Sequence, residues 1–485
     1  MKRWKRSGAL ILAAVLSLSL SACGGSEPTP EEILDQTLQN SQEGLESLSA
    51  SVTAQIDMEV QVGDQTQAME TILTQRGHTL VPFEGEADVY VVNTCSVTAV
   101  SDKKCRNMIR RTRRDHPEAV VAVCGCYAQA QPDAIAALGV DLVAGTGDRL
   151  AFLDRLEQWS VRRPAEASVS VDDALQRHDF ELLPAGGLAG RTRAMLKVED
   201  GCGNFCTYCI IPFTRGPVRS ESIPAAAAQA NALAEAGYHE IVITGIEISS
   251  WGSDLDTGET LIDLIEAVCR AAPGLRVRLG SLEPRTITED FCRRAAQLDN
   301  LCPHFHLALQ SGCDATLQRM NRKYTAARFL ESCRLLRRYF DRPALTTDLI
   351  CGFPGETEEE FAATLALIQE ADFSAMHIFP YSRRSGTVAD RRPDQLPNAV
   401  KEARCHRAAE AARTMEIRYL DSWVGKTLPV LFEERTEGGW RGHAPNYVEV
   451  FLLDGPAGPS DSLHNVVKSV EIAGRRGRSL EGVIV

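Results

Sequence analysis

Short apolar runs alternate with amphipathic segments along most of the chain from residue 66 onward. The runs at 87–95 and 119–129 are typical of buried strands, and residues 66–78 carry apolar side chains at helical spacing up to Gly77. Strand-like runs separated by helix-like segments follow at 193–199, 239–245, 276–282, 304–310, 345–351 and 375–381. This alternation predicts parallel strands with right-handed crossovers, and therefore an α/β fold.

The chain is expected to form several domains, because 485 residues are too many for a single hydrophobic core. An open α/β sheet domain is expected at 67–150, followed by a linker of weak periodicity at 151–190. Residues 191–420 predict an incomplete barrel of six βα units that ends in a long helix. Short strands and Gly/Pro turns at 421–485 predict a small β-barrel.

The first 66 residues follow a different pattern. Basic residues precede an apolar run at 9–20, and Leu-Ser-Ala-Cys then ends at Cys23. This order resembles a bacterial lipoprotein signal peptide, here 1–25, and its apolar run is short for a membrane span. A free hydrophobic helix is the alternative. Residues 26–66 form an acidic segment without Lys or Arg.

Charge and cysteine content limit the function classes. A net charge of −13 argues against indiscriminate nucleic-acid binding, although residues 103–114 are densely basic. Such a basic stretch either binds a phosphate backbone or forms a solvated helix face. The 15 cysteines occur partly in tight clusters, which in a reducing compartment favours metal or redox chemistry over disulfides.

Three cysteines are closely spaced directly after the first barrel strand, at Cys202, Cys206 and Cys209. Disulfides would leave one thiol unpaired, and zinc would require a fourth ligand that the neighbouring sequence does not offer. An iron–sulfur cubane usually takes four thiolates, so three would leave one iron open to a substrate or cofactor. The loop lies at the barrel end where catalysis occurs.

The spacing C-x3-C-x2-C, with an aromatic residue before the last cysteine, resembles the signature of radical S-adenosylmethionine (SAM) enzymes. The stretches "DGCGNFCTYCIIPFTRGPVRS", "ITGIEISSWG", "LALQSGCDATLQRMNRKYT" and "TDLICGFPGETEEEF" further resemble methylthiotransferases that modify transfer RNA. "ADVYVVNTCSVTAVSDKKCRNMIRR" and "CGCYAQ" resemble the family's N-terminal domain, which carries an auxiliary cluster. The resemblance covers about residues 66–485 and is greatest to the branch acting on N6-threonylcarbamoyladenosine at position 37.

The resemblance implies roles for individual residues. Cys202, Cys206 and Cys209 would bind the catalytic [4Fe-4S] cluster, and Cys95 and Cys126 an auxiliary one. Cys105 and Cys124 are expected to be small buried thiols. Side chains at the strand ends would contact SAM or the target adenosine, or else cap helices and turns: Thr244, Glu247, Ser281, Glu283 and Gln310.

The tail resembles a TRAM domain, a small RNA-binding barrel. Its basic and aromatic residues are candidates for phosphate or stacking contacts: Arg441, His443, Tyr447, Arg475, Arg476 and Arg478. The alternative is a barrel that only caps the structure.

The implied reaction transfers a methylthio group to carbon 2 of the adenine. This carbon has no acidic proton, so acid–base catalysis alone cannot activate it, whereas a radical derived from SAM can. An electron donor such as flavodoxin or ferredoxin and a sulfur source are then required, and no stable membrane partner is expected. Alternatives are action on isopentenyladenosine transfer RNA, action on a ribosomal-protein aspartate, or a lipoprotein with a metal-binding or redox cysteine cluster.

The family resemblance also predicts that two features are missing near the N-terminus. The N-terminal domain is expected to lack its first strand, together with a cysteine ligand that would fall near Glu59. Because clusters, SAM and transfer RNA belong to the cytosol, the catalytic part is expected there. The leader is then interpreted as a fused or wrongly joined start.

Overall fold

The computed structural model describes residues 53–57, 64–83, 85–96, 98–161, 163, 166–185, 192–453 and 462–485. Segment 1–25, on which the lipoprotein hypothesis rests, lies outside these residues, and so does Glu59. None of the helices in the described ranges is long and apolar enough to cross a membrane.

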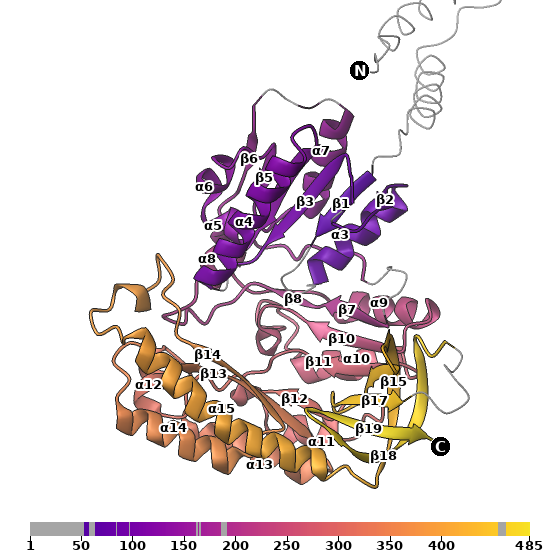
Figure 1. Ribbon diagram of the computed structural model, residues 1–485, viewed down its shortest axis with the longest axis vertical. Helices are drawn as coiled ribbons and strands as arrows, with labels where there is room; N and C mark the ends of the chain where they lie inside the picture. The colour runs from indigo at the N-terminus through magenta and orange to yellow at the C-terminus, as the bar shows by residue number, and fades with distance from the viewer. Residues whose placement is uncertain are drawn as a thin grey trace, which may run out of the picture. The chain divides into compact units, whose positions relative to one another are not determined.

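The first part of the described chain is a six-stranded parallel sheet in the order β2-β1-β3-β4-β5-β6 (Figure 1). Its strands are β1 (Thr53–Asp57), β2 (Thr79–Leu80), β3 (Val89–Thr94), β4 (Val120–Gly125), β5 (Leu142–Ala144) and β6 (Ser168–Ser170). Its helices are α3 (Asp64–Gln75), α4 (Ala99–Asp115), α5 (Cys126–Ala130), α6 (Pro132–Ala136) and α7 (Arg149–Val161).

Alternate side chains of the central strands enter two separate cores. Val91 and Ala122 pack with residues of α3 and α7, whereas Val92 and Val123 pack with residues of α4, α5 and α6. Because both faces are covered, β3 and β4 are apolar almost throughout, as in sheets buried on both sides.

Two predictions about this sheet are wrong. The sheet does not lack a strand, since β1 pairs in parallel with both β2 and β3. The segment 151–190 is also more than a linker, because it contains most of α7 and the edge strand β6, which pairs with β5. The sequences of β1 and β6, TAQID and SVS, contain few large apolar residues, so neither gave a recognisable apolar run.

The predicted six βα units are present in the central part. The parallel strands are β7 (Arg193–Lys197), β10 (Glu240–Thr244), β11 (Arg276–Leu279), β12 (His304–His306), β13 (Ala344–Cys351) and β14 (Ala375–Pro380). They form two three-stranded sheets, joined by an isolated parallel bridge between Leu282 and Leu307. Among the described residues β7 and β14 do not pair, so the barrel stays open.

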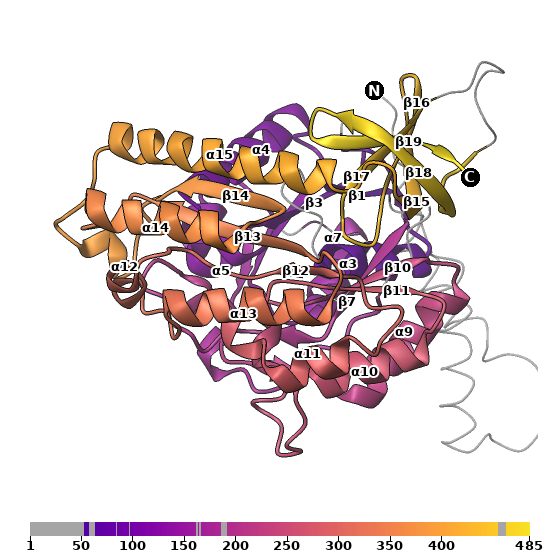
Figure 2. The same ribbon diagram turned by 90° about the horizontal axis from the view of Figure 1, so that it is seen from below.

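Helices cover the outside of these strands (Figure 2). They are α9 (Ile223–Glu235), α10 (Leu261–Ala271), α11 (Glu289–Ala295), α12 (Asp314–Arg319), α13 (Ala326–Tyr339), α14 (Glu358–Ala371) and α15 (Asn398–Asp421). The long α15 runs along β14 and covers the last strand. A single large core fills the space between helices and strands.

The C-terminal part is a closed five-stranded barrel, as predicted. Its strands, in the order β15-β16-β17-β19-β18, are β15 (Thr427–Thr436), β16 (Gly439–His443), β17 (Glu449–Leu453), β18 (Val466–Arg476) and β19 (Ser479–Ile484). Apolar side chains fill its interior, among them Val430, Phe432 and Val450.

Candidate active site

The three clustered cysteines occupy one loop at the carboxyl end of the barrel. The loop joins β8 (Glu199–Asp200), just after β7, to α8 (Ile211–Arg215). The Cys202 N–H donates to the Gly216 carbonyl oxygen at 3.0 Å, and the Cys209 N–H to the Cys206 carbonyl oxygen at 3.0 Å. These bonds shape the loop, and Cys206 and Cys209 are charge neighbours of Cys202 within it.

Burial favours the protonated thiols of Cys202 and Cys209 when no metal is bound. Desolvation raises the pKa of Cys202 to about 12 and that of Cys209 to about 11. Repulsion from Glu247, Cys209 and Cys206 adds to the shift of Cys202, and repulsion from Cys206 and Cys126 adds to that of Cys209. A cationic cluster would replace the protons and compensate the thiolate charges.

The donor set fits an iron–sulfur cluster better than a single metal ion. No three His, Cys, Asp or Glu side chains among the described residues are arranged to hold one metal ion. A cubane spreads its thiolate ligands around a larger core than one ion has, and three cysteines leave its fourth iron open.

An arginine that sequence reasoning missed lies against this loop. Arg322 donates from Nη1 to the Cys206 sulfur at 3.2 Å, and its Nη2 pairs with the Glu283 carboxylate. The Arg322 and Glu283 side chains are only 7% and 6% exposed, so the pair is nearly dry. The only sequence signal is position, because Arg322 follows the turn after α12 at the barrel mouth.

The predicted auxiliary cysteines lie at the carboxyl ends of two adjacent strands of the first sheet. Cys95 follows β3 and Cys126 follows β4, which is where ligands bind in open α/β sheets. The Cys126 sulfur accepts a hydrogen bond from Arg215 Nε at 3.3 Å. Cys126 also raises the pKa of Cys209 by charge repulsion. The first sheet thus brings a thiol close to the cysteine loop of the barrel.

Two further thiols lie near these cysteines. Cys105 donates to the Cys95 carbonyl oxygen at 3.8 Å, and Cys124 to Asn93 Oδ1 at 3.7 Å. Both are buried, as predicted, and desolvation raises the pKa of each.

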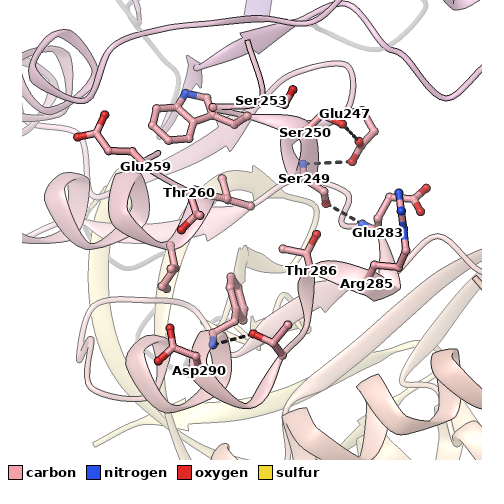
Figure 3. A pocket seen from close by; sticks show the side chains of 16 residues that line it. Glu247, Ser249, Ser250, Ser253, Glu259, Thr260, Glu283, Arg285, Thr286 and Asp290 are labelled. Carbon is pink, nitrogen blue, oxygen red and sulfur yellow. Dashed lines mark hydrogen bonds between the residues drawn. The ribbon is translucent and has the colours of Figure 1, made fainter. Parts of the chain in front are cut away.

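A cavity of about 510 Å³ borders the mouth beside the loops after β10 and β11, and its lining mixes hydroxyl and carboxylate groups with apolar side chains (Figure 3). Of the five residues predicted to contact SAM or the adenosine, Glu247 and Glu283 line it. Glu247 accepts bonds from Ser249 N at 3.1 Å and from the Ser250 hydroxyl, and Ser249 Oγ accepts from Glu283 N at 2.8 Å. Burial and the neighbouring Glu283 raise the pKa of Glu247 to about 7.

The other three predicted residues do not line this cavity. Thr244 ends β10, and its carbonyl oxygen accepts from Val198 N at 2.9 Å. Ser281 is exposed, and Gln310 adopts a left-handed backbone conformation with φ of 59°. Its carbonyl oxygen accepts from Ile350 N at 3.0 Å. The backbones of Thr244 and Gln310 therefore join strand ends.

Glu199 is a second residue that sequence reasoning missed. It is fully buried, and its Oε2 accepts from Glu247 N at 2.7 Å, while Oε1 is buried without a hydrogen-bond partner among the described residues. Desolvation raises the pKa of Glu199 to about 8. Any side chain at Gly245 would place its Cβ 2.6 Å from Oε2, so this position requires glycine.

The predicted RNA contacts in the C-terminal barrel fall into two groups. His443 and Tyr447 stack at 4.8 Å, and the guanidinium groups of Arg193 and Arg278 lie 5.0 and 4.7 Å from the Tyr447 ring. These two aromatic residues therefore contact the strands of the large barrel.

The four arginines of the predicted RNA set have partners within the chain. Arg441 pairs with Glu434 and Glu449, Arg475 with Asp421, and Arg478 with Glu416, whereas Arg476 lies over the Phe451 ring.

Comparisons with known proteins match both parts of the chain that contribute to this site, the first sheet and the barrel. The radical SAM superfamily matches residues 196–368, and the uncharacterized protein family UPF0004 matches residues 61–145. A solved radical SAM methyltransferase, TsrM from Kitasatospora setae, shares the fold with a TM-score of 0.51 at 15% identity. That match covers 70% of this chain and 77% of TsrM.

Curated relatives align over most of their own length. The threonylcarbamoyladenosine tRNA methylthiotransferase MtaB of Bacillus subtilis is 38% identical over 83% of this chain and 90% of the relative. The enzyme of the same name from Thermotoga maritima is 34% identical over 76% and 83%. A tRNA-2-methylthio-N(6)-dimethylallyladenosine synthase from Oceanobacillus iheyensis is 32% identical over 87% and 81%. The chain therefore belongs to the tRNA methylthiotransferase family of radical SAM enzymes.

Proposed function

We propose that this chain transfers a methylthio group to carbon 2 of N6-threonylcarbamoyladenosine at position 37 of transfer RNA. The observation that carries the proposal is the position of Cys126, at the end of β4, where its sulfur accepts a hydrogen bond from Arg215 of α8, the helix that directly follows the barrel cysteine loop. A reaction that takes sulfur from one site and activates carbon at another requires the two sites to be adjacent. The name shared by the Bacillus and Thermotoga relatives supports this nucleoside.

Each group of residues has a role in this proposal. Cys202, Cys206 and Cys209 would hold a [4Fe-4S] cluster that, with SAM bound, supplies the radical that removes hydrogen from the adenine. Cys95 and Cys126 would hold the auxiliary cluster. The cavity beside Glu247 and Glu283 offers hydroxyl and carboxylate groups for the polar parts of SAM or the nucleoside.

The radical step also requires groups outside the chain. A low-potential electron donor such as flavodoxin or ferredoxin and a sulfur source are proposed as further partners. Because reduced clusters, SAM and transfer RNA meet in the cytosol, the catalytic part is proposed to act there.

The second candidate function is modification of isopentenyladenosine, which the Oceanobacillus relative supports. Mass spectrometry of nucleosides from cells with and without the gene separates the candidates. The proposal expects loss of 2-methylthio-threonylcarbamoyladenosine in cells without the gene. Loss of only the isopentenyl derivative, or of a methylthio-aspartate in protein, would refute it.

A further inference from the structure

We propose that the exposed face of α4 binds the phosphate backbone of the substrate RNA and guides it into the site, which rests on the function proposed above. This face, called the α4 basic face below, consists of Lys103, Lys104, Arg110, Arg111 and Arg114. The sequence left open whether the basic stretch 103–114 binds phosphate or only faces solvent. The individual residues expected to contact RNA lie instead in the C-terminal barrel.

The α4 basic face follows from helix periodicity. Residues 103, 104, 107, 110, 111 and 114 project within about 120° of one another at 3.6 residues per turn. All six are exposed, while Asp102, Cys105, Ile109 and Thr112 are buried on the opposite side. The helix thus separates a packed side from a charged one.

The charges on this face are only weakly neutralised within the protein. Arg111 and Arg114 share one partner, Asp115, at 3.6 and 2.8 Å. Lys103, Lys104 and Arg110 have no ion pair with any described residue. In the C-terminal barrel, by contrast, Arg441, Arg475 and Arg478 each pair with a carboxylate. A surface with free positive charge on a protein of net charge −13 fits a polyanion.

The first turns of α4 are fixed beside the proposed sulfur-transfer site. Cys105 donates to the carbonyl oxygen of Cys95, and Ser96 Oγ donates to Asp102 Oδ1 at 3.1 Å. Asp102 also pairs with Arg384, from the loop after β14 at the barrel mouth. The basic face therefore begins within one turn of the Cys95 loop and extends about 16 Å along the helix, at 1.5 Å per residue.

This placement suits an RNA whose target base enters the barrel mouth. The base would be unstacked into the site, and the neighbouring backbone would need positive charge just outside it. Phosphate contacts fix the register of a nucleic acid without reading its sequence. The α4 basic face would therefore contribute affinity and register, and the mouth would select the nucleoside.

The test is a fourfold variant, K103Q/K104Q/R110Q/R111Q, compared with a fourfold control of equal charge change. The control, R270Q/R334Q/R338Q/R407Q, removes exposed arginines of α10, α13 and α15 that pair with carboxylates. Fluorescence anisotropy with purified transfer RNA, at several salt concentrations, gives the affinity and its salt dependence. Thermal unfolding and iron content verify that both variants fold and load clusters.

The expected result is at least about tenfold weaker binding by the α4 variant, with KM for transfer RNA raised and kcat retained. Each lost phosphate contact should reduce the slope of log affinity against log salt by about 0.7–0.9. The control should stay within about twofold of wild type. Equal losses in both variants, or an unchanged α4 variant, would overturn the inference.

Two further outcomes distinguish RNA binding by the α4 basic face from docking of a protein partner and from failure of the proposed function. If the wild-type chain does not bind transfer RNA at all, the proposed function itself fails. If the α4 variant binds RNA normally but loses turnover only with a protein reductant, and not with dithionite, the face docks the electron donor instead. That result would overturn the assignment to RNA.

Discussion

Arg322 illustrates how a single side chain affects the proposed cluster. Its guanidinium donates to the Cys206 sulfur, and the nearly dry ion pair with Glu283 holds it in place. A hydrogen bond and a positive charge at a ligand sulfur stabilise the reduced cluster, which carries the extra electron. We therefore expect R322Q to shift the reduction potential of the proposed cluster to a more negative value, and R322K to shift it less.

The measurement is a redox titration followed by electron paramagnetic resonance. Cys95 and Cys126 are replaced by Ala, so that only the barrel cluster reports. The matched control is R215Q, because Arg215 donates a hydrogen bond to Cys126. Equal potentials in R322Q and wild type would contradict the role assigned to Arg322.

The barrel cysteines give the most direct prediction at this scale. Replacing Cys202, Cys206 or Cys209 by Ala removes one thiolate of the proposed cluster. Each variant should lose reductive cleavage of SAM to 5′-deoxyadenosine. The control is C269A, which removes a buried thiol from the main core. Cleavage that survives in all three loop variants would refute the site.

Glu199 predicts a pH dependence of stability. Burial raises its pKa to about 8 from 4.5, so the folded state binds its proton more tightly than the unfolded state does. Its contribution to stability is therefore complete below about pH 4.5 and is lost as the pH rises through about 8. Glutamine stays neutral, so E199Q should gain thermal stability over wild type near pH 8 and lose that advantage near pH 5.

Thermal unfolding of the metal-free protein across this pH range tests the prediction for Glu199. E235Q, an exposed change on α9, serves as the control and should show no such trend. A difference between E199Q and wild type that does not vary with pH would contradict the assignment.

At the scale of elements, the sequence predicted the parts with strong periodicity and missed the weakest strands. The six barrel strands and α15 are long or regularly spaced, so their pattern is visible without tertiary information. β1 has five residues and β6 has three, and both are defined by pairing with a neighbour. Pairing partners are distant in the chain, which local patterns do not record.

In the candidate site, too, the sequence predicted the residues that are close together in the chain and missed those that are far apart. The cysteines of the barrel loop follow one another within eight residues, and their spacing alone indicates a cluster. Arg322 reaches Cys206 from 116 positions away, and Arg215 reaches Cys126 from 89 positions away. Such contacts depend on the assembled barrel, so residue type and spacing do not reveal them.

The auxiliary site leads to a prediction about position 59, which lies outside the described residues. The family resemblance places a third cysteine near Glu59, and a carboxylate is a poor substitute for thiolate on an iron–sulfur cluster. With only Cys95 and Cys126 to hold the auxiliary cluster, we expect the unmodified chain to retain it poorly and to bind roughly one cluster's worth of iron, and E59C to approach roughly two. SAM cleavage should be similar in both, whereas methylthio transfer should rise in E59C.

The two buried thiols beside the auxiliary site provide the controls for this prediction. Cys105 and Cys124 lie near Cys95 and Cys126, so C105A and C124A show whether either completes the ligand set. Full methylthio transfer by the unmodified chain, lost in one of these variants, would show that the expected cysteine near Glu59 is not needed.

At the scale of the whole molecule, one buried ion pair links the first sheet to the barrel. Arg384, in the loop after β14, pairs with Asp102 and donates to Ser96 Oγ. The side chains of Arg384 and Asp102 are 6% and 10% exposed. Removing one partner leaves a buried charge uncompensated, which typically costs about 3–5 kcal/mol, whereas replacing both by apolar residues is often neutral.

We expect R384M to lower the thermal stability and D102L/R384M to restore most of it. Both variants should cleave SAM, because the barrel loop and its cysteines are unchanged. Both should transfer sulfur poorly, since the pair holds the first turn of α4, and with it the Cys95 loop, against the barrel mouth. Stability and SAM cleavage are measured together with methylthio transfer to RNA. If D102L/R384M regains both stability and full methylthio transfer, the ion pair only stabilises the protein. If D102L/R384M regains stability but not transfer, the ion pair also sets the distance between the two proposed clusters.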